Sequence, residues 1–236
     1  MRSTLPAATP DRLAPTSVVE CPLCQGRFAA FGRAGSRDGV VCPGCGSRER
    51  HRACWLFLAE RPELLAGAGS LLHFAPEAYL RDRIAARANL RYITADLVAG
   101  RADLALDVTD LKLPDAAFGA VLCSHVLEHV PEDRQAMREL HRVLKPGGWA
   151  LVMVPLDIRR EATYEDPSIT DAQGRVEAFN QFDHVRLYAP DIAGRLRDAG
   201  FEVEEVPVAE RLGPDLSRRH GLLRSDRVYL CSKGGG

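Results

Sequence analysis

The chain has 236 residues and carries 31 Lys and Arg against 32 Asp and Glu, for a formal charge of −1. This near balance argues against a protein that holds nucleic acid mainly by bulk charge, and a hydrophobic content of 46% is ordinary for a soluble globular chain. Seven cysteines are an odd number, which argues against a full disulfide framework. No apolar run approaches the ~18 residues of a membrane span. No secretory signal is recognised either, so we expect a cytoplasmic protein.

The first segments of the chain are a polar start and a cysteine-rich unit. Residues 1–18 are rich in Ala, Pro, Ser and Thr, and we expect a flexible tail there. Residues 19–54 hold two Cys-x-x-Cys pairs, which predict a zinc ribbon with four thiolate ligands: Cys21, Cys24, Cys42 and Cys45. A site closed by four thiolates is structural rather than catalytic. Ser47 is expected to cap the helix that follows the second pair.

From about residue 55 the pattern changes to short apolar runs that alternate with helical segments. This alternation predicts an α/β, Rossmann-like, doubly wound sheet that extends over 55–236. We expect seven strands at 69–74, 90–97, 102–108, 118–124, 149–155, 201–208 and 227–231, the last two as an antiparallel pair. Helices are expected at 77–88, 131–145 and 190–199. Residues 156–188 are polar and rich in carboxylates, and they predict an insertion over the edge of the sheet, a candidate lid.

Polar residues recur where the predicted strands end. Asp96 ends the second strand about twenty residues past the first strand–helix turn, the spacing at which a carboxylate receives the ribose hydroxyls of a nucleotide-like cofactor. Asp107 ends the third strand, and Ser124 and His125 follow the fourth. The carboxyl ends of parallel strands meet at one edge, so these residues predict a ligand crevice there.

Three stretches carry a resemblance to a known family. They are DVTDLKLPDAAF at 107–118, HVLEHVP at 125–131 and RELHRVLKPGG at 138–148, with DHVRLY at 183–188 further on. Together they resemble the class I S-adenosylmethionine-dependent methyltransferases, in particular the UbiE-like (methyltransferase type 11) group. The resemblance covers residues 69–232 and implies a seven-stranded methyltransferase sheet. With the predicted zinc ribbon N-terminal to this domain, the chain also looks like a subfamily of bacterial methyltransferases.

The resemblance implies which residues contact S-adenosylmethionine. Asp96 would bind the ribose diol, Asp107 the adenine amine with Val108 against the ring, and Glu77 the ammonium group. The implied set is Phe74, Ala75, Glu77, Asp96, Leu97, Asp107, Val108 and Ser124. The family's glycine-rich loop after the first strand is replaced here by His73-Phe74-Ala75-Pro76-Glu77, and Ala75 is small enough for close approach of a ligand.

Candidate catalytic bases are His125 and His129 beside the predicted crevice, and Tyr164 and His184 in the insertion. The motifs of nucleobase-amine and cytosine-C5 methylation are absent after the fourth strand. We therefore expect an O- or N-methyltransferase for a small molecule or peptide, in a biosynthetic role. Two alternatives stay open: an RNA-modifying enzyme that uses the ribbon with Arg48, Arg50 and Arg52 as its reader, and a non-catalytic module on a degenerate methyltransferase fold.

Overall fold

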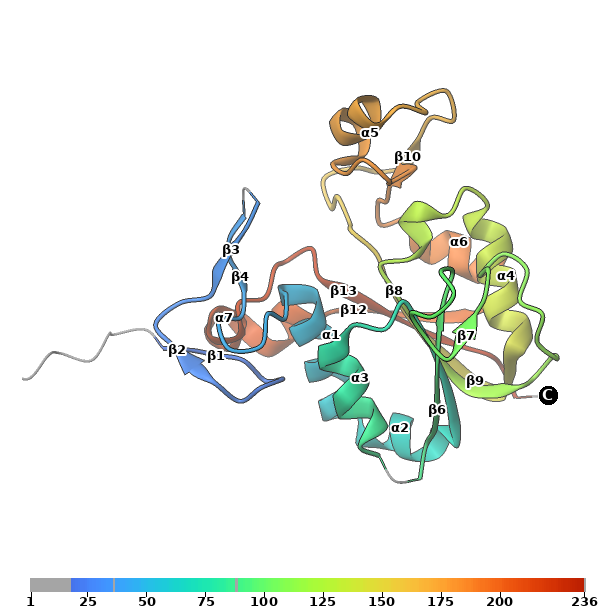
Figure 1. The fold of residues 1–236 in the computed structure, drawn as a ribbon, viewed down its shortest axis with the longest axis horizontal. Coiled ribbons are helices and arrows are strands. Elements are labelled where there is room, and N and C mark those ends of the chain that lie inside the picture. Colours follow the sequence, from blue (N-terminus) through green and yellow to red (C-terminus); the bar gives the residue numbers. More distant parts are fainter. Residues whose placement is uncertain (1–17, 36, 88, 236) are drawn as a thin grey trace, which may run out of the picture.

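The computed structural model describes residues 18–35, 37–87 and 89–235, so the predicted tail at 1–18 lies almost wholly outside the described residues. A seven-stranded sheet runs through the molecule in the order β12-β13-β9-β8-β5-β6-β7 (Figure 1). Its strands are β5 (Ser70–Phe74), β6 (Arg91–Asp96), β7 (Leu104–Ala105), β8 (Phe118–Ser124), β9 (Leu144–Met153), β12 (Glu202–Pro207) and β13 (Arg227–Ser232). The strands from β9 to β7 are parallel, and β13 is antiparallel to both of its neighbours, so the predicted sheet is confirmed.

Helices cover both faces of the sheet. One face packs against α1 (Glu49–Glu60), α2 (Pro62–Ala68), α3 (Ala78–Ala85) and α7 (Val208–His220), and the other against α4 (Asp133–Val143) and α6 (Ile192–Asp198). Every residue of β8 is buried, as expected for a parallel strand covered on both faces. No helix within the described residues has both the length and the apolar character needed to cross a bilayer.

Two small units project beyond the sheet, the N-terminal unit at the left of Figure 1 and the insertion at its top. The N-terminal unit consists of the hairpins β1 (Val19–Glu20) with β2 (Arg27–Phe28) and β3 (Gly32–Ala34) with β4 (Arg37–Val41). The insertion contains β10 (Tyr164–Glu165), α5 (Ala172–Phe179) and β11 (Arg186–Leu187), and β10 pairs with β11. This insertion is anchored to the sheet domain by the ion pair of Glu165 with Arg195 of α6, and by hydrogen bonds from Arg186 to the carbonyl oxygens of Leu127 and Pro131.

Two local expectations differ from the structure. The helix after the second cysteine pair begins at Glu49, with Arg48 at its N-cap, so Ser47 does not cap it. Instead, the Ser47 hydroxyl lies 3.4 Å from the sulfur of Cys21 and 3.2 Å from that of Cys45. The third strand is only two residues long, because Asp107 leaves the sheet and caps a turn by accepting from the Thr109 N–H at 2.8 Å.

Arg52 joins the N-terminal unit to the sheet domain. Its side chain is wholly buried, and its guanidinium donates to four carbonyl oxygens: Val40, Ser47, His220 and Gly221. The guanidinium carbon also lies 3.9 Å from the centre of the Phe31 ring. Because these carbonyls belong to β4, the second cysteine turn and the end of α7, Arg52 fastens three segments together. Arg52 is therefore not available as an RNA reader.

Candidate active site and cysteine cluster

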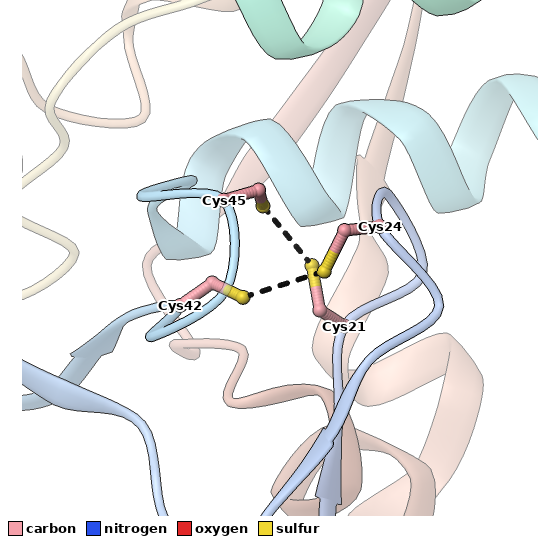
Figure 2. A group of neighbouring side chains, drawn as sticks. All are labelled: Cys21, Cys24, Cys42 and Cys45. Atoms are coloured by element: carbon pink, nitrogen blue, oxygen red, sulfur yellow. Dashed lines mark hydrogen bonds between the residues drawn. The ribbon is translucent and has the colours of Figure 1, made fainter.

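The four cysteines of the N-terminal unit converge on one point (Figure 2). The sulfurs of Cys21 and Cys45 are 3.7 Å apart, and those of Cys24 and Cys42 are 3.6 Å apart. A tetrahedral zinc ion with Zn–S bonds of ~2.3 Å would hold its sulfurs ~3.8 Å apart, so the spacing fits four thiolates around one ion. The other three cysteines, Cys54, Cys123 and Cys231, are buried elsewhere in the fold.

A cavity of about 1050 Å³ opens at the carboxyl edge of the sheet. Its floor contains Ala75 after β5, Ser124 and His125 at the end of β8, and Val154 after β9. The N-terminal unit and the start of α1 contribute a wall through Arg37, Arg48, Glu49 and Arg50, while the insertion contributes Asn180, Gln181 and His184. The N-terminal unit therefore shapes the candidate site, a role that the sequence did not indicate.

Strained backbone gathers at this cavity. Among the described residues, five other than glycine have a positive φ: Gln25, Ala75, Ala116, His125 and Asn180. Three of them, Ala75, His125 and Asn180, line the cavity. Residues held in such conformations cluster at functional sites, so the strain independently marks this edge of the sheet. Ala75, at φ 46°, adopts the left-handed conformation that glycine takes at lower cost.

The residues implied to bind S-adenosylmethionine divide into two groups. Ala75, Glu77 and Ser124 line the cavity, and Phe74 is buried beneath them. Asp96, Leu97, Asp107 and Val108 lie farther along the same edge, after β6 and β7. The register Phe74↔Ala95 places Asp96 beside Ala75 on the neighbouring parallel strand. Leu97 is 72% exposed, and Val108 is buried.

Glu77 is the acidic group nearest the replaced glycine-rich loop. Its Oε1 atom lies 3.0 Å from Nε2 of His51, and its Oε2 atom lies 3.9 Å from Nε2 of His73. Burial opposes ionisation of this carboxyl, but the hydrogen bond with His51 and nearby positive charges hold its pKa below the usual value. Glu77 is therefore a carboxylate at the cavity wall, suited to a cationic group of a ligand.

The four candidate bases lie in different places. His125 and His129 line the cavity from the loop after β8, and His184 lines it from the insertion. His125 Nδ1 is 3.3 Å from Glu128 Oε1. Tyr164 is not among the lining residues; its ring packs 5.6 Å from that of Phe179, centre to centre. Glu128 of the HVLEHVP motif, a further candidate from the sequence, also lines the cavity.

His73 makes the stability of this site dependent on pH. Burial lowers the pKa of His73 to about 4, whereas an unfolded chain has about 6.5. Below pH 6.5 the unfolded chain therefore binds a proton that the folded chain does not, and the stability that neutral His73 contributes is lost as the pH falls toward 4. Between pH 7 and pH 5 we expect the free energy of unfolding of the parent protein to fall by about 2 kcal/mol more than that of His73→Gln. Urea unfolding of both proteins measures this difference, and a difference that stays constant with pH contradicts it.

Residues 72–152, from β5 to β9, match the family model of a methyltransferase domain. A probable S-adenosylmethionine-dependent methyltransferase of Mycolicibacterium smegmatis is 33% identical over 138 residues, which cover 58% of this chain and 47% of the relative. A second probable S-adenosylmethionine-dependent methyltransferase, from Mycobacterium tuberculosis, is 31% identical over 118 residues, which cover 49% of this chain and 39% of that relative. The chain thus spans less than half the length of these curated relatives.

Solved structures give the same fold. An O-methyltransferase family protein from Burkholderia thailandensis aligns with a TM-score of 0.51 at 18% identity, over 79% of this chain and 60% of that one. An S-adenosylmethionine-dependent methyltransferase from Archaeoglobus fulgidus aligns with a TM-score of 0.50 at 14% identity, over 78% of this chain and 94% of that one. At these identities the likeness shows the fold alone. The matched domain and the curated relatives make this chain similar to S-adenosylmethionine-dependent methyltransferases.

Proposed function

We propose that this chain transfers the methyl group of S-adenosylmethionine to an oxygen or nitrogen acceptor on a small molecule or peptide, in a biosynthetic reaction within a reducing, cytoplasmic compartment. The observation that carries the proposal is the row of polar groups along one sheet edge. Asp96 ends β6 and Asp107 follows β7, while Glu77 and Ser124 line the cavity beside them. This row lies where a doubly wound sheet binds its ligand.

Alignment at the cavity would supply much of the acceleration. Methyl transfer is an in-line displacement: a lone pair of the acceptor forms the new bond as the methyl–sulfur bond breaks and S-adenosylhomocysteine leaves. A hydroxyl acceptor must also lose a proton. We assign that proton to Nε2 of His125, because its Nδ1 faces Glu128 Oε1 at 3.3 Å and the carboxylate holds the ring in place.

The cysteine cluster is proposed to hold a structural zinc ion. Its sulfur spacing fits a tetrahedral ion, and four thiolates close the coordination sphere. The unit 19–54 is thus proposed as a zinc ribbon, followed by the methyltransferase domain at 55–236. Helix α1 runs continuously across this boundary, so the two units share a rigid connection. In this arrangement the metal acts on catalysis only by holding the cavity wall.

The cofactor assignment is tested by calorimetric titration with S-adenosylhomocysteine. We expect Asp96→Ala to weaken binding by about 100-fold, because two hydrogen bonds to a charged acceptor are together worth about 3 kcal/mol. The matched control is Asp110→Ala, which removes an exposed carboxylate paired with Lys112 beyond the same strand edge and should bind as the parent does. Equal affinity in all three proteins would remove Asp96 from the site.

The same titration separates the alternatives. Absence of binding to both S-adenosylmethionine and S-adenosylhomocysteine would favour a non-catalytic module. The RNA-modifying alternative has lost part of its support, since Arg52 is buried and Arg48 and Arg50 line the cavity. Binding of structured RNA with a steep dependence on salt would restore it.

A further inference from the structure

Three side chains with metal-binding atoms meet in the cavity, away from the cysteine cluster. Glu128 and His129 belong to the short helix η1 (Leu127–His129), and His184 comes from the insertion. One ligand atom from each lies within 4.8 Å of the other two. The rings of His129 and His184 stand edge to face, with their centres 4.8 Å apart. Residues fifty-five positions apart in the chain are thus brought to one point.

The hydrogen bonds around the two imidazoles fix which nitrogen is free. His184 Nδ1 lies 3.1 Å from the carbonyl oxygen of Phe179, and His129 Nδ1 lies 3.2 Å from that of Asp183. A carbonyl oxygen can only accept, so each Nδ1 carries the proton. The Nε2 atom of each neutral ring is then left with its lone pair. Histidines that bind metal ions are typically oriented by such a bond to a carbonyl from the other ring nitrogen.

Glu128 provides the independent observation that points to a ligand. Its side chain is buried, with the residue only 1% exposed, and it lines the cavity. Within the part of the chain that the structure describes, the Oε2 atom has no hydrogen-bond partner, while Oε1 lies 3.3 Å from Nδ1 of His125. A buried carboxylate oxygen without a partner is costly, so a cation in the cavity would relieve a real penalty. The arrangement presents three lone pairs to one point.

We propose that Glu128, His129 and His184 bind a divalent transition-metal ion, at a second site distinct from the four cysteines. Two imidazoles and one carboxylate suit ions such as Zn²⁺, Co²⁺, Fe²⁺ or Mn²⁺ rather than Ca²⁺. Three protein ligands leave coordination positions open on the cavity side, in contrast to the closed cysteine cluster. An oxygen of a bound molecule or a water completes the sphere. The site does not depend on methyl transfer.

Cobalt titration of the full, untagged chain tests the proposal, after a single equivalent of zinc has been added to fill the closed four-thiolate cluster and leave the second site empty. We expect one equivalent of Co²⁺ to bind with visible d–d bands and without the near-ultraviolet charge-transfer absorption of thiolate ligands. His184→Ala should weaken this binding at least 10-fold. The matched control is His141→Ala on α4, whose imidazole packs against Phe201 and is not among the residues that line the cavity; it should bind like the parent.

Glu128→Gln serves as the second variant, because it keeps the shape of the buried side chain but removes its charge. It should also weaken Co²⁺ binding at least 10-fold while the melting temperature of the zinc-loaded protein shows that it is folded. Absence of Co²⁺ binding by the zinc-loaded parent would overturn the proposal. Unchanged affinity in His184→Ala and Glu128→Gln would overturn it as well. Binding of S-adenosylhomocysteine is measured separately on the same proteins. A failure of the metal site can therefore be distinguished from a failure of the proposed function.

Discussion

Replacing Cys24 by serine is expected to release one zinc ion per chain and to unfold the N-terminal unit. Zinc binding contributes about 10–16 kcal/mol to the folding of small thiolate and imidazole domains, and the strands of this unit are only two to five residues long. Metal analysis together with thermal unfolding of the parent and of Cys24→Ser measures both effects. Strong chelators should reproduce them in the parent protein.

Cys54→Ala provides the control for this experiment. Cys54 is fully buried in α1 and outside the cluster, so its loss leaves a small void but should retain the zinc. Because Arg37, Arg48 and Glu49 line the cavity, Cys24→Ser should also weaken ligand binding, whereas Cys54→Ala should not. A Cys24→Ser protein that melts as the parent does, with no metal found in either, would contradict the zinc assignment.

Arg52→Met is expected to lower the free energy of unfolding by about 4 kcal/mol. Methionine fills a similar volume but leaves four carbonyl oxygens without their donor, and each unpaired buried group costs about 1–3 kcal/mol. The cation–π contact with Phe31 is lost too. Urea unfolding followed by circular dichroism measures the change.

Arg27→Met is the comparison for Arg52. Arg27 lies in the same N-terminal unit, but its side chain is 66% exposed and pairs with Glu20 only at 3.6 Å. Its loss should change stability by less than about 1 kcal/mol. Similar effects of the two substitutions would show that Arg52 does not fasten the N-terminal unit to α7.

Local patterns were sufficient to predict most of the sheet. The apolar run at 118–124 coincides with β8, and the antiparallel pairing of the last two strands is confirmed by the register Val203↔Cys231. Helix α7 was missed, because Gly213 and Pro214 stand inside it and Gly213 has a positive φ. Both residues normally end a helix, and here the chain kinks and continues. Packing of α7 against α1, β1 and β12 overrides the local signal.

The candidate site was predictable only in part. Strand-end positions placed Ala75, Ser124 and His125 at the cavity, since strand ends follow from the sequence pattern alone. The wall built by Arg37 and Glu49 depends on how the N-terminal unit docks onto the sheet, a tertiary contact without a local signature. The same holds for His184, which reaches Glu128 and His129 only because the insertion is anchored through Glu165. Arg52 shows that a local pattern can also mislead. It stands in a basic segment and was a candidate RNA reader, but its side chain is buried.

The most direct test of the account is a structure of the full chain with bound S-adenosylhomocysteine. The account predicts the ribose hydroxyls on the carboxylate of Asp96, the adenine between Asp107 and Val108, and the amino-acid end beside Ala75 and Glu77. The sulfur would then face the cavity that His125 lines. A ligand bound elsewhere on the sheet, or a cavity edge at which S-adenosylhomocysteine makes no contact with Asp96, would contradict it.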